Sequence, residues 1–154
     1  MVDGEILEAV SALIRNGPGF DREAVARFFD GRGWLLVGNY PFPREWRLHG
    51  VEAVYERGET HDSIAFILHE SHSDWGPTDE QLAELSHVLA DVTRQLVEGL
   101  GKTFEVAEVA DHPCRMTEEI DVRYFRIGSF LMQTGTFIGD GVLPTMIIAR
   151  LEDV

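Results

Sequence analysis

The densest group of side chains that could do chemistry lies between positions 61 and 74. Residue types that bind metal ions recur there as His61, Asp62, His69, Glu70, His72 and Asp74. A zinc-protease motif places two histidines four residues apart on a helix, whereas His69 and His72 are three apart and follow a strand-like run. We therefore expect a polar strand end. The alternative is a metal-binding domain or metal-dependent enzyme that uses His61, His69, His72 and Asp74.

The single cysteine, Cys114, lies two residues after His112 and is a second candidate. A thiolate nucleophile needs a base and a group that orients the base, and sequence neighbours seldom provide that geometry. The nearby acids Asp111, Glu118 and Glu119 oppose the positive environment that would activate a thiol. The chain contains no GxSxG, P-loop or GxGxxG motif. We therefore predict a protein that is not an enzyme and uses no cofactor.

Charge is the most unusual property of the composition. The chain has 27 acidic and 13 basic residues, a net charge of −14, and both halves are acidic. Phosphate backbones and anionic membrane surfaces bind clustered lysine and arginine, so we expect neither nucleic acid nor a membrane as a partner. The acidity serves either solubility or the steering of a basic protein partner.

Aromatic residues flank the expected first strands, and exposed aromatic rings often anchor protein partners. These residues are Trp34, Tyr40, Phe42, Trp46 and Trp75. Core packing is their alternative role, and we select Trp46 and Trp75 as the candidate anchors. Three acidic groups could steer the partner: Glu52 with Glu56, Asp74 with Asp79 and Glu80, and Glu118 with Glu119 and Asp121. We favour the third, because residues 105–121 contain six acids and one base.

The spacing of apolar residues predicts three helices. Asp3 can cap a helix that ends near Asn16, and Asp21 can cap a second that ends at Gly31. Thr78 and Gln81 form a capping box for a longer third helix. The apolar face of this third helix contains Leu82, Leu85, Leu89, Val92, Leu96 and Leu100.

Period-two alternation and turn residues predict strands before and after this long helix. The expected strands are 34–37, 46–56 and 62–69, a short one at 104–109, and then 120–127, 130–138 and 143–151. Hairpin-length connections favour a single α+β domain over residues 1–154, with an antiparallel sheet packed by one long central helix and two N-terminal helices. The second face of the sheet is either covered by the N-terminal helices or offered to a partner.

Two features bear on the compartment. No apolar run approaches the roughly 20 residues that span a bilayer, and the first residues are acidic where a signal peptide is basic. A lone cysteine cannot form a disulfide within one chain. We expect a cytoplasmic protein.

The order of elements, the acidity and the lack of catalytic motifs resemble two groups of small binding proteins. The segments that carry the resemblance are FDREAVARFFDGRGW and LADVTRQLVEGLGKTFEVAEV. One group is the immunity proteins of bacterial polymorphic toxin systems, and the other is the acidic chaperones of secretion systems. The resemblance implies a cytoplasmic protein that neutralises or escorts a basic toxin or effector, and it leaves a homo-oligomer open. A toxin immunity protein is the more specific expectation.

Overall fold

The computed structural model describes residues 4–17, 20–38, 46–48, 50–57, 62–72, 75–110, 119–139 and 144–153. Its helices are α1 (Gly4–Asn16), α2 (Arg22–Gly31) and α3 (Asp79–Gly101). Its strands are β1 (Leu35–Leu36), β2 (Trp46–Leu48), β3 (Val51–Glu56), β4 (Ser63–Ser71), β5 (Val106–Val109), β6 (Glu119–Ile127), β7 (Phe130–Phe137) and β8 (Thr145–Asp153).

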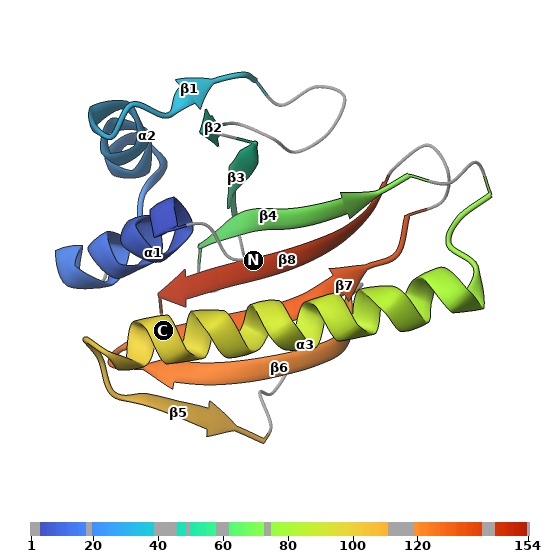
Figure 1. Cartoon of the computed structure of the whole chain (residues 1–154). Coiled ribbons are helices and arrows are strands. Elements are labelled where there is room, and N and C mark those ends of the chain that lie inside the picture. Colours follow the sequence, from blue (N-terminus) through green and yellow to red (C-terminus); the bar gives the residue numbers. More distant parts are fainter. Residues whose placement is uncertain are drawn as a thin grey trace.

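The described strands form one antiparallel sheet in the order β1-β2-β3-β4-β8-β7-β6-β5 (Figure 1). Neighbouring strands in the sequence pair as hairpins on each side of the centre. The central pairing, β4 with β8, joins segments from opposite ends of the chain, for example Phe66 with Ala149. The α+β fold with an antiparallel sheet and one long helix is confirmed.

Helix α3 forms where its capping residues and apolar face predict it. The Thr78 hydroxyl accepts a hydrogen bond from the backbone N–H of Gln81, and the Gln81 side chain accepts one from the N–H of Thr78. The buried residues of the helix are Leu85, Leu89, Val92, Thr93, Leu96 and Leu100. Thr93 and Thr134 share a buried hydroxyl hydrogen bond of 2.9 Å, which fixes α3 over β7.

All three described helices pack on the same face of the sheet (Figure 1). One core cluster joins Val10 of α1, Phe29 of α2 and Leu96 of α3 to alternate strand residues such as Phe66 and Leu151. Of the two expectations for the second face, coverage by the N-terminal helices is therefore wrong. The physical reason is that Phe29 and Ile6 complete the same apolar core that α3 begins.

Several predicted strand ends shift by one or two residues, as in β4 and β8, and two further differences concern 46–56 and 104–109. The expected single strand 46–56 is wrong, because Gly50 has a φ of 83° and separates β2 from β3, which then pair as a hairpin. The expected short strand at 104–109 is confirmed as β5, although it is shorter. No helix among the described residues is long and apolar enough to cross a membrane.

Candidate partner-binding surface and the polar face of the sheet

The histidine-rich segment does not gather metal ligands in the part of it that the structure describes. His69 pairs with Ile147 across the sheet, and a bulge between Ile67 and His69 shifts the register of β4. His72 is largely exposed and lies 3.4 Å from the Glu70 carboxylate. No group of three potential ligands converges among the described residues. His61 and Asp74 lie outside the described residues, as do His112 and Cys114.

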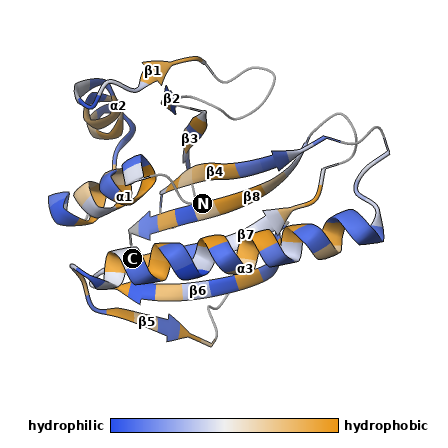
Figure 2. Ribbon diagram, in the orientation of Figure 1, coloured by the Kyte–Doolittle hydropathy of each residue, from blue (hydrophilic) through white to orange (hydrophobic). Residues whose placement is uncertain are grey.

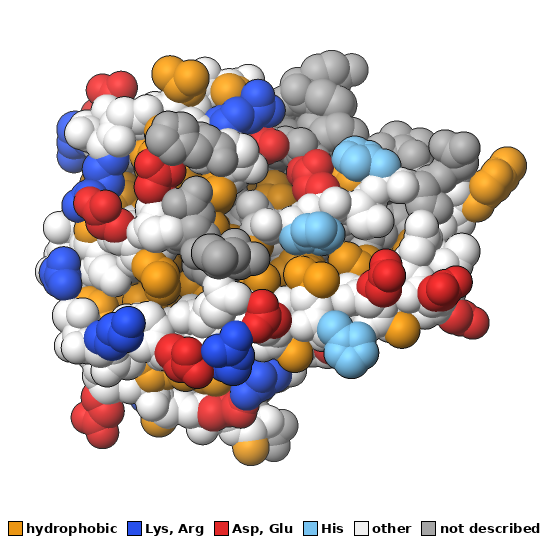
Figure 3. Space-filling view, viewed as in Figure 1, with side chains coloured by type: hydrophobic (Ala, Val, Ile, Leu, Met, Phe, Trp, Pro, Cys, Tyr) orange, Lys and Arg blue, Asp and Glu red, His pale blue; other side chains and the backbone are white. Residues whose placement is uncertain are grey.

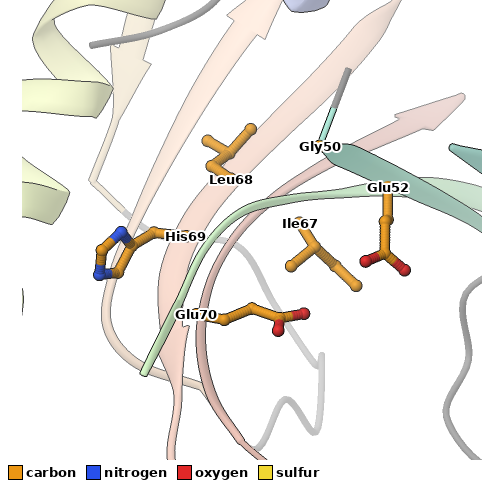
Figure 4. A pocket seen from close by; sticks show the side chains of 6 residues that line it. All are labelled: Gly50, Glu52, Ile67, Leu68, His69 and Glu70. Atoms are coloured by element: carbon orange, nitrogen blue, oxygen red, sulfur yellow. The ribbon is translucent and has the colours of Figure 1, made fainter. Parts of the chain in front are cut away.

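A cavity of about 280 Å³ lies where β4 extends past the start of β3. Its lining residues are Gly50, Glu52, Ile67, Leu68, His69 and Glu70. The carboxylates of Glu52 and Glu70 point to one side of β4, whereas His69 points to the other (Figure 4). Glu52 is also 3.6 Å from Arg47, and Glu70 contacts His72. The histidine therefore does not share a site with the two carboxylates.

The sheet face opposite the helices has a buried ion cluster at its centre. Arg150 donates two hydrogen bonds to Glu56, of 2.6 and 3.3 Å, and its Nη1 lies 2.6 Å from Oε1 of Glu119. The side chains of Arg150 and Glu119 are only 11% and 4% exposed. Burial lowers the pKa of Arg150, but hydrogen bonds and charge from Glu56 and Glu119 outweigh it and raise that pKa. The cluster ties β3, β6 and β8 together.

Gln133 lies beside this cluster, because it pairs with Arg150 across β7 and β8 and so shares its face. Its side chain is buried, and among the residues that the structure describes neither its amide nitrogen nor its amide oxygen has a hydrogen-bond partner. Gly135, also on β7, lies beneath Glu119: a Cβ there would lie 3.0 Å from that of Glu119. The missing side chain at Gly135 lets Glu119 approach β7 closely enough to meet Arg150.

The structure places the acids that we selected for partner steering in different environments. Glu119 is buried in an ion pair, so the expectation that it is exposed to a partner is wrong. Asp121 is exposed and has a φ of 54° where β6 bulges. Glu118 lies outside the described residues. Glu52 and Glu56 face the same side of the sheet as Arg150, and Glu52 is buried.

Trp46 also differs from its expected role. Its side chain is 3% exposed and stacks on Phe29 with ring centroids 4.7 Å apart. Phe29 additionally meets Trp34 edge-on at 4.9 Å. Trp46 is therefore a core residue and not the partner anchor that we selected, because α2 brings Phe29 against β2 and closes the core over the indole.

Trp75, unlike Trp46, is exposed to solvent. It is 97% exposed and lies just before α3, whose outward face begins with Asp79, Glu80 and Glu84, all exposed. Residues 79–93 contain no lysine or arginine. Arg94 follows and bonds to Asp91 at 2.5 Å and to Glu98 at 3.2 Å. Figure 3 shows acidic side chains gathered over the N-terminal end of α3. We call the set Trp75, Asp79, Glu80 and Glu84 the Trp75–α3 surface.

Sequence reasoning missed Arg150 and Gln133. The signal was present, because an arginine within the apolar run MIIARL predicts a buried partner of opposite charge. No family model, curated protein or solved structure matches the chain. The function is therefore argued from the chemistry of these surfaces.

Proposed function

We propose that this protein is a non-catalytic binding protein that holds a basic protein partner on the Trp75–α3 surface. The observation that carries the proposal is the exposed indole of Trp75, four residues before α3 begins, together with three exposed carboxylates in the first two turns of that helix. An indole that projects into water gains free energy when a partner covers it, and tryptophan is among the commonest anchors of protein interfaces.

Charge gives the second argument. The net charge of −14 attracts a basic partner at long range, and the first turns of α3 concentrate acid without a neighbouring lysine or arginine. Asp79 and Glu80 also stabilise the helix, because carboxylates near a helix N-terminus interact favourably with its dipole. A basic side chain that binds there meets carboxylates held on a rigid element.

The biological role that fits best is neutralisation or escort of the basic partner. Toxin immunity is the more specific version of this role, and a secretion chaperone is the alternative. An immunity protein needs acids that accelerate association and an aromatic anchor that slows dissociation. The Trp75–α3 surface supplies both.

The proposal is tested by parallel capture from extracts of the source organism on three immobilised forms of the protein. These are the wild type, a Trp75→Ala variant and a triple variant with Asp79→Lys, Glu80→Lys and Glu84→Lys. We expect one basic protein to be retained by the wild type and lost from both variants, with binding then measured on the purified pair.

The matched control is Glu105→Lys, which reverses an exposed charge beyond the far end of α3. It should retain the partner. If the surface variants and the wild type capture the same proteins, the Trp75–α3 surface is not the binding site.

A further inference from the structure

Strand β1 lies at one edge of the described sheet, and its two residues and Val37, which follows it, expose consecutive apolar side chains. Leu35 is 67% exposed, Leu36 72% and Val37 41%. Leu35 and Leu36 point to opposite faces of the strand, so each face of this edge carries an exposed leucine. Among the described strands β1 has a neighbour, β2, on one side only (Figure 1), and Figure 2 shows β1 as an apolar ribbon at the margin.

The opposite edge of the sheet is protected in the usual way. Strand β5 places Glu108 at the margin, where it bonds to Arg123 of β6 at 2.7 Å. Charged side chains on an edge strand oppose pairing with another chain. By contrast, residues 33–43 contain no charged residue, although 26% of the chain is charged. The other long uncharged stretch, 127–139, contains β7, which lies inside the sheet and is buried.

Charge near β1 differs from charge elsewhere. Residues 20–48 contain five arginines and four acids, a net charge of +1, in a chain whose net charge is −14. Arg32 and Arg47, which flank β1 in the fold, are partly exposed and pair with Glu8 and Glu52, which lie outside that segment and bring the balance at this end from +1 to −1. This end of the sheet is therefore the place where two copies can meet with little like-charge repulsion.

We propose that two copies of this chain associate through β1, in antiparallel register about a twofold axis. Backbone N–H and C=O groups of the free edge would pair between the copies, and the exposed leucines would pack against their symmetry mates. A twofold contact brings the same patch of each copy together, so a self-complementary apolar edge of almost neutral charge suits it. A basic partner would find no steering charge here.

The patch is small. Stable complexes bury roughly 800 Å² per partner, and three side chains with a short strand supply less. The dimer should therefore be weak and should form mainly at high protein concentration. Because each copy carries −14, added salt should strengthen it by screening the remaining repulsion.

Sedimentation equilibrium of the purified protein tests the proposal over about 10 μM to about 1 mM, the range in which weak contacts form. The wild-type mass should rise from 17.3 kDa toward twice that value as concentration increases. Leu36→Lys should remain at the monomer mass throughout. Because Leu36 is exposed, the circular dichroism and melting temperature of the Leu36→Lys variant should match those of the wild type.

Ala107→Lys is the matched control, since it adds the same charge to the exposed part of the opposite edge strand. It should dimerise as the wild type does, and so should Trp75→Ala. At high concentration, amide hydrogen exchange at residues 35–37 should slow. A wild type that stays monomeric, or a dimer that survives Leu36→Lys, would overturn the proposal while leaving the Trp75–α3 surface unaffected.

Discussion

At the residue scale, Arg150 has the most constrained surroundings. Its guanidinium lies between Glu56 and Glu119 on a sheet face where Val54, Ala65 and Ile67 are also buried. Removing water from Arg150 and Glu119 is costly, and the attraction within the cluster compensates only while all the partners are present. The cluster therefore specifies how β3, β6 and β8 are arranged more than it adds stability.

Arg150→Met should lower the free energy of unfolding by about 3 to 5 kcal/mol, because Glu119 would stay buried without a cation. Urea denaturation measures the loss. The double variant Arg150→Met with Glu119→Leu should recover much of it, since it removes the isolated charge. A loss below about 1 kcal/mol in the single variant would mean that the pair behaves as a surface salt bridge.

Tyr55 gives a pH prediction. Its hydroxyl donates a hydrogen bond to Asp62, and burial together with that carboxylate raises the pKa of Tyr55 from 10.0 to about 12. A raised pKa in the folded state stabilises the fold below the unfolded pKa and loses that contribution as pH rises through the folded pKa. Unfolding free energy should fall between about pH 10 and pH 12.

Tyr55→Phe is the control for this effect, because it removes the titrating hydroxyl and keeps the ring. Its unfolding free energy should fall less over the same pH window, as followed by urea denaturation at each pH. Absorbance titration of the wild type should also show tyrosine ionisation near pH 12 that Tyr55→Phe lacks. Equal pH dependence in both proteins would contradict the assignment.

At the element scale, α3 connects the two halves of the sheet and packs against both. It is the connection between the first four strands and the last four, and its buried leucines lie against both groups. Leu85 and Leu89 contact Ile147 of the central strand β8, while Leu96 and Leu100 join the large core beneath α1 and α2. A substitution that disrupts the packing of α3 should therefore destabilise the whole domain.

Leu89→Ala should destabilise the protein by about 2 to 5 kcal/mol, because Leu89 is 4% exposed and its loss leaves a cavity over Ile147. Chemical denaturation followed by circular dichroism checks the value. Ser86→Ala, an exposed change one turn earlier, should alter stability by less than about 0.5 kcal/mol. Similar effects of both changes would contradict the packing of α3 on the sheet.

At the scale of the whole molecule, the two proposed surfaces differ in chemistry and in place. The Trp75–α3 surface is acidic and lies at the N-terminal end of α3, whereas β1 is apolar and lies at the far margin of the sheet (Figure 1). Salt should therefore act on them in opposite directions. Partner binding should weaken as salt rises, and self-association should strengthen.

For the partner, raising salt from about 0.05 to about 0.5 M shortens the Debye length from roughly 14 to roughly 4 Å, so the association rate should fall steeply. Trp75→Ala should instead speed dissociation, at a cost of about 2 to 4 kcal/mol in affinity. Stopped-flow mixing with the captured partner separates the two rates. If the association rate changes neither with salt nor when the charges of Asp79, Glu80 and Glu84 are reversed, the acidity serves solubility and not the steering of a partner.

The sequence by itself determined the local elements of this protein. The capping box at Thr78 and Gln81, the cap at Asp21 and the alternation in the later strands each depend on neighbours along the chain, so a linear pattern predicts them. Net charge is likewise a sum over the chain and was readable directly from the sequence.

Only the tertiary structure decided which side chains are accessible. Alternation assigns a strand two faces, but it does not say which strands become neighbours, and β4 pairs with β8 from the other end of the chain. That pairing places Arg150 between Glu56 and Glu119 and so buries an acid expected at the surface. The packing of α2 likewise buries Trp46, while Trp75, a residue of the same type, stays exposed because no described element packs over it.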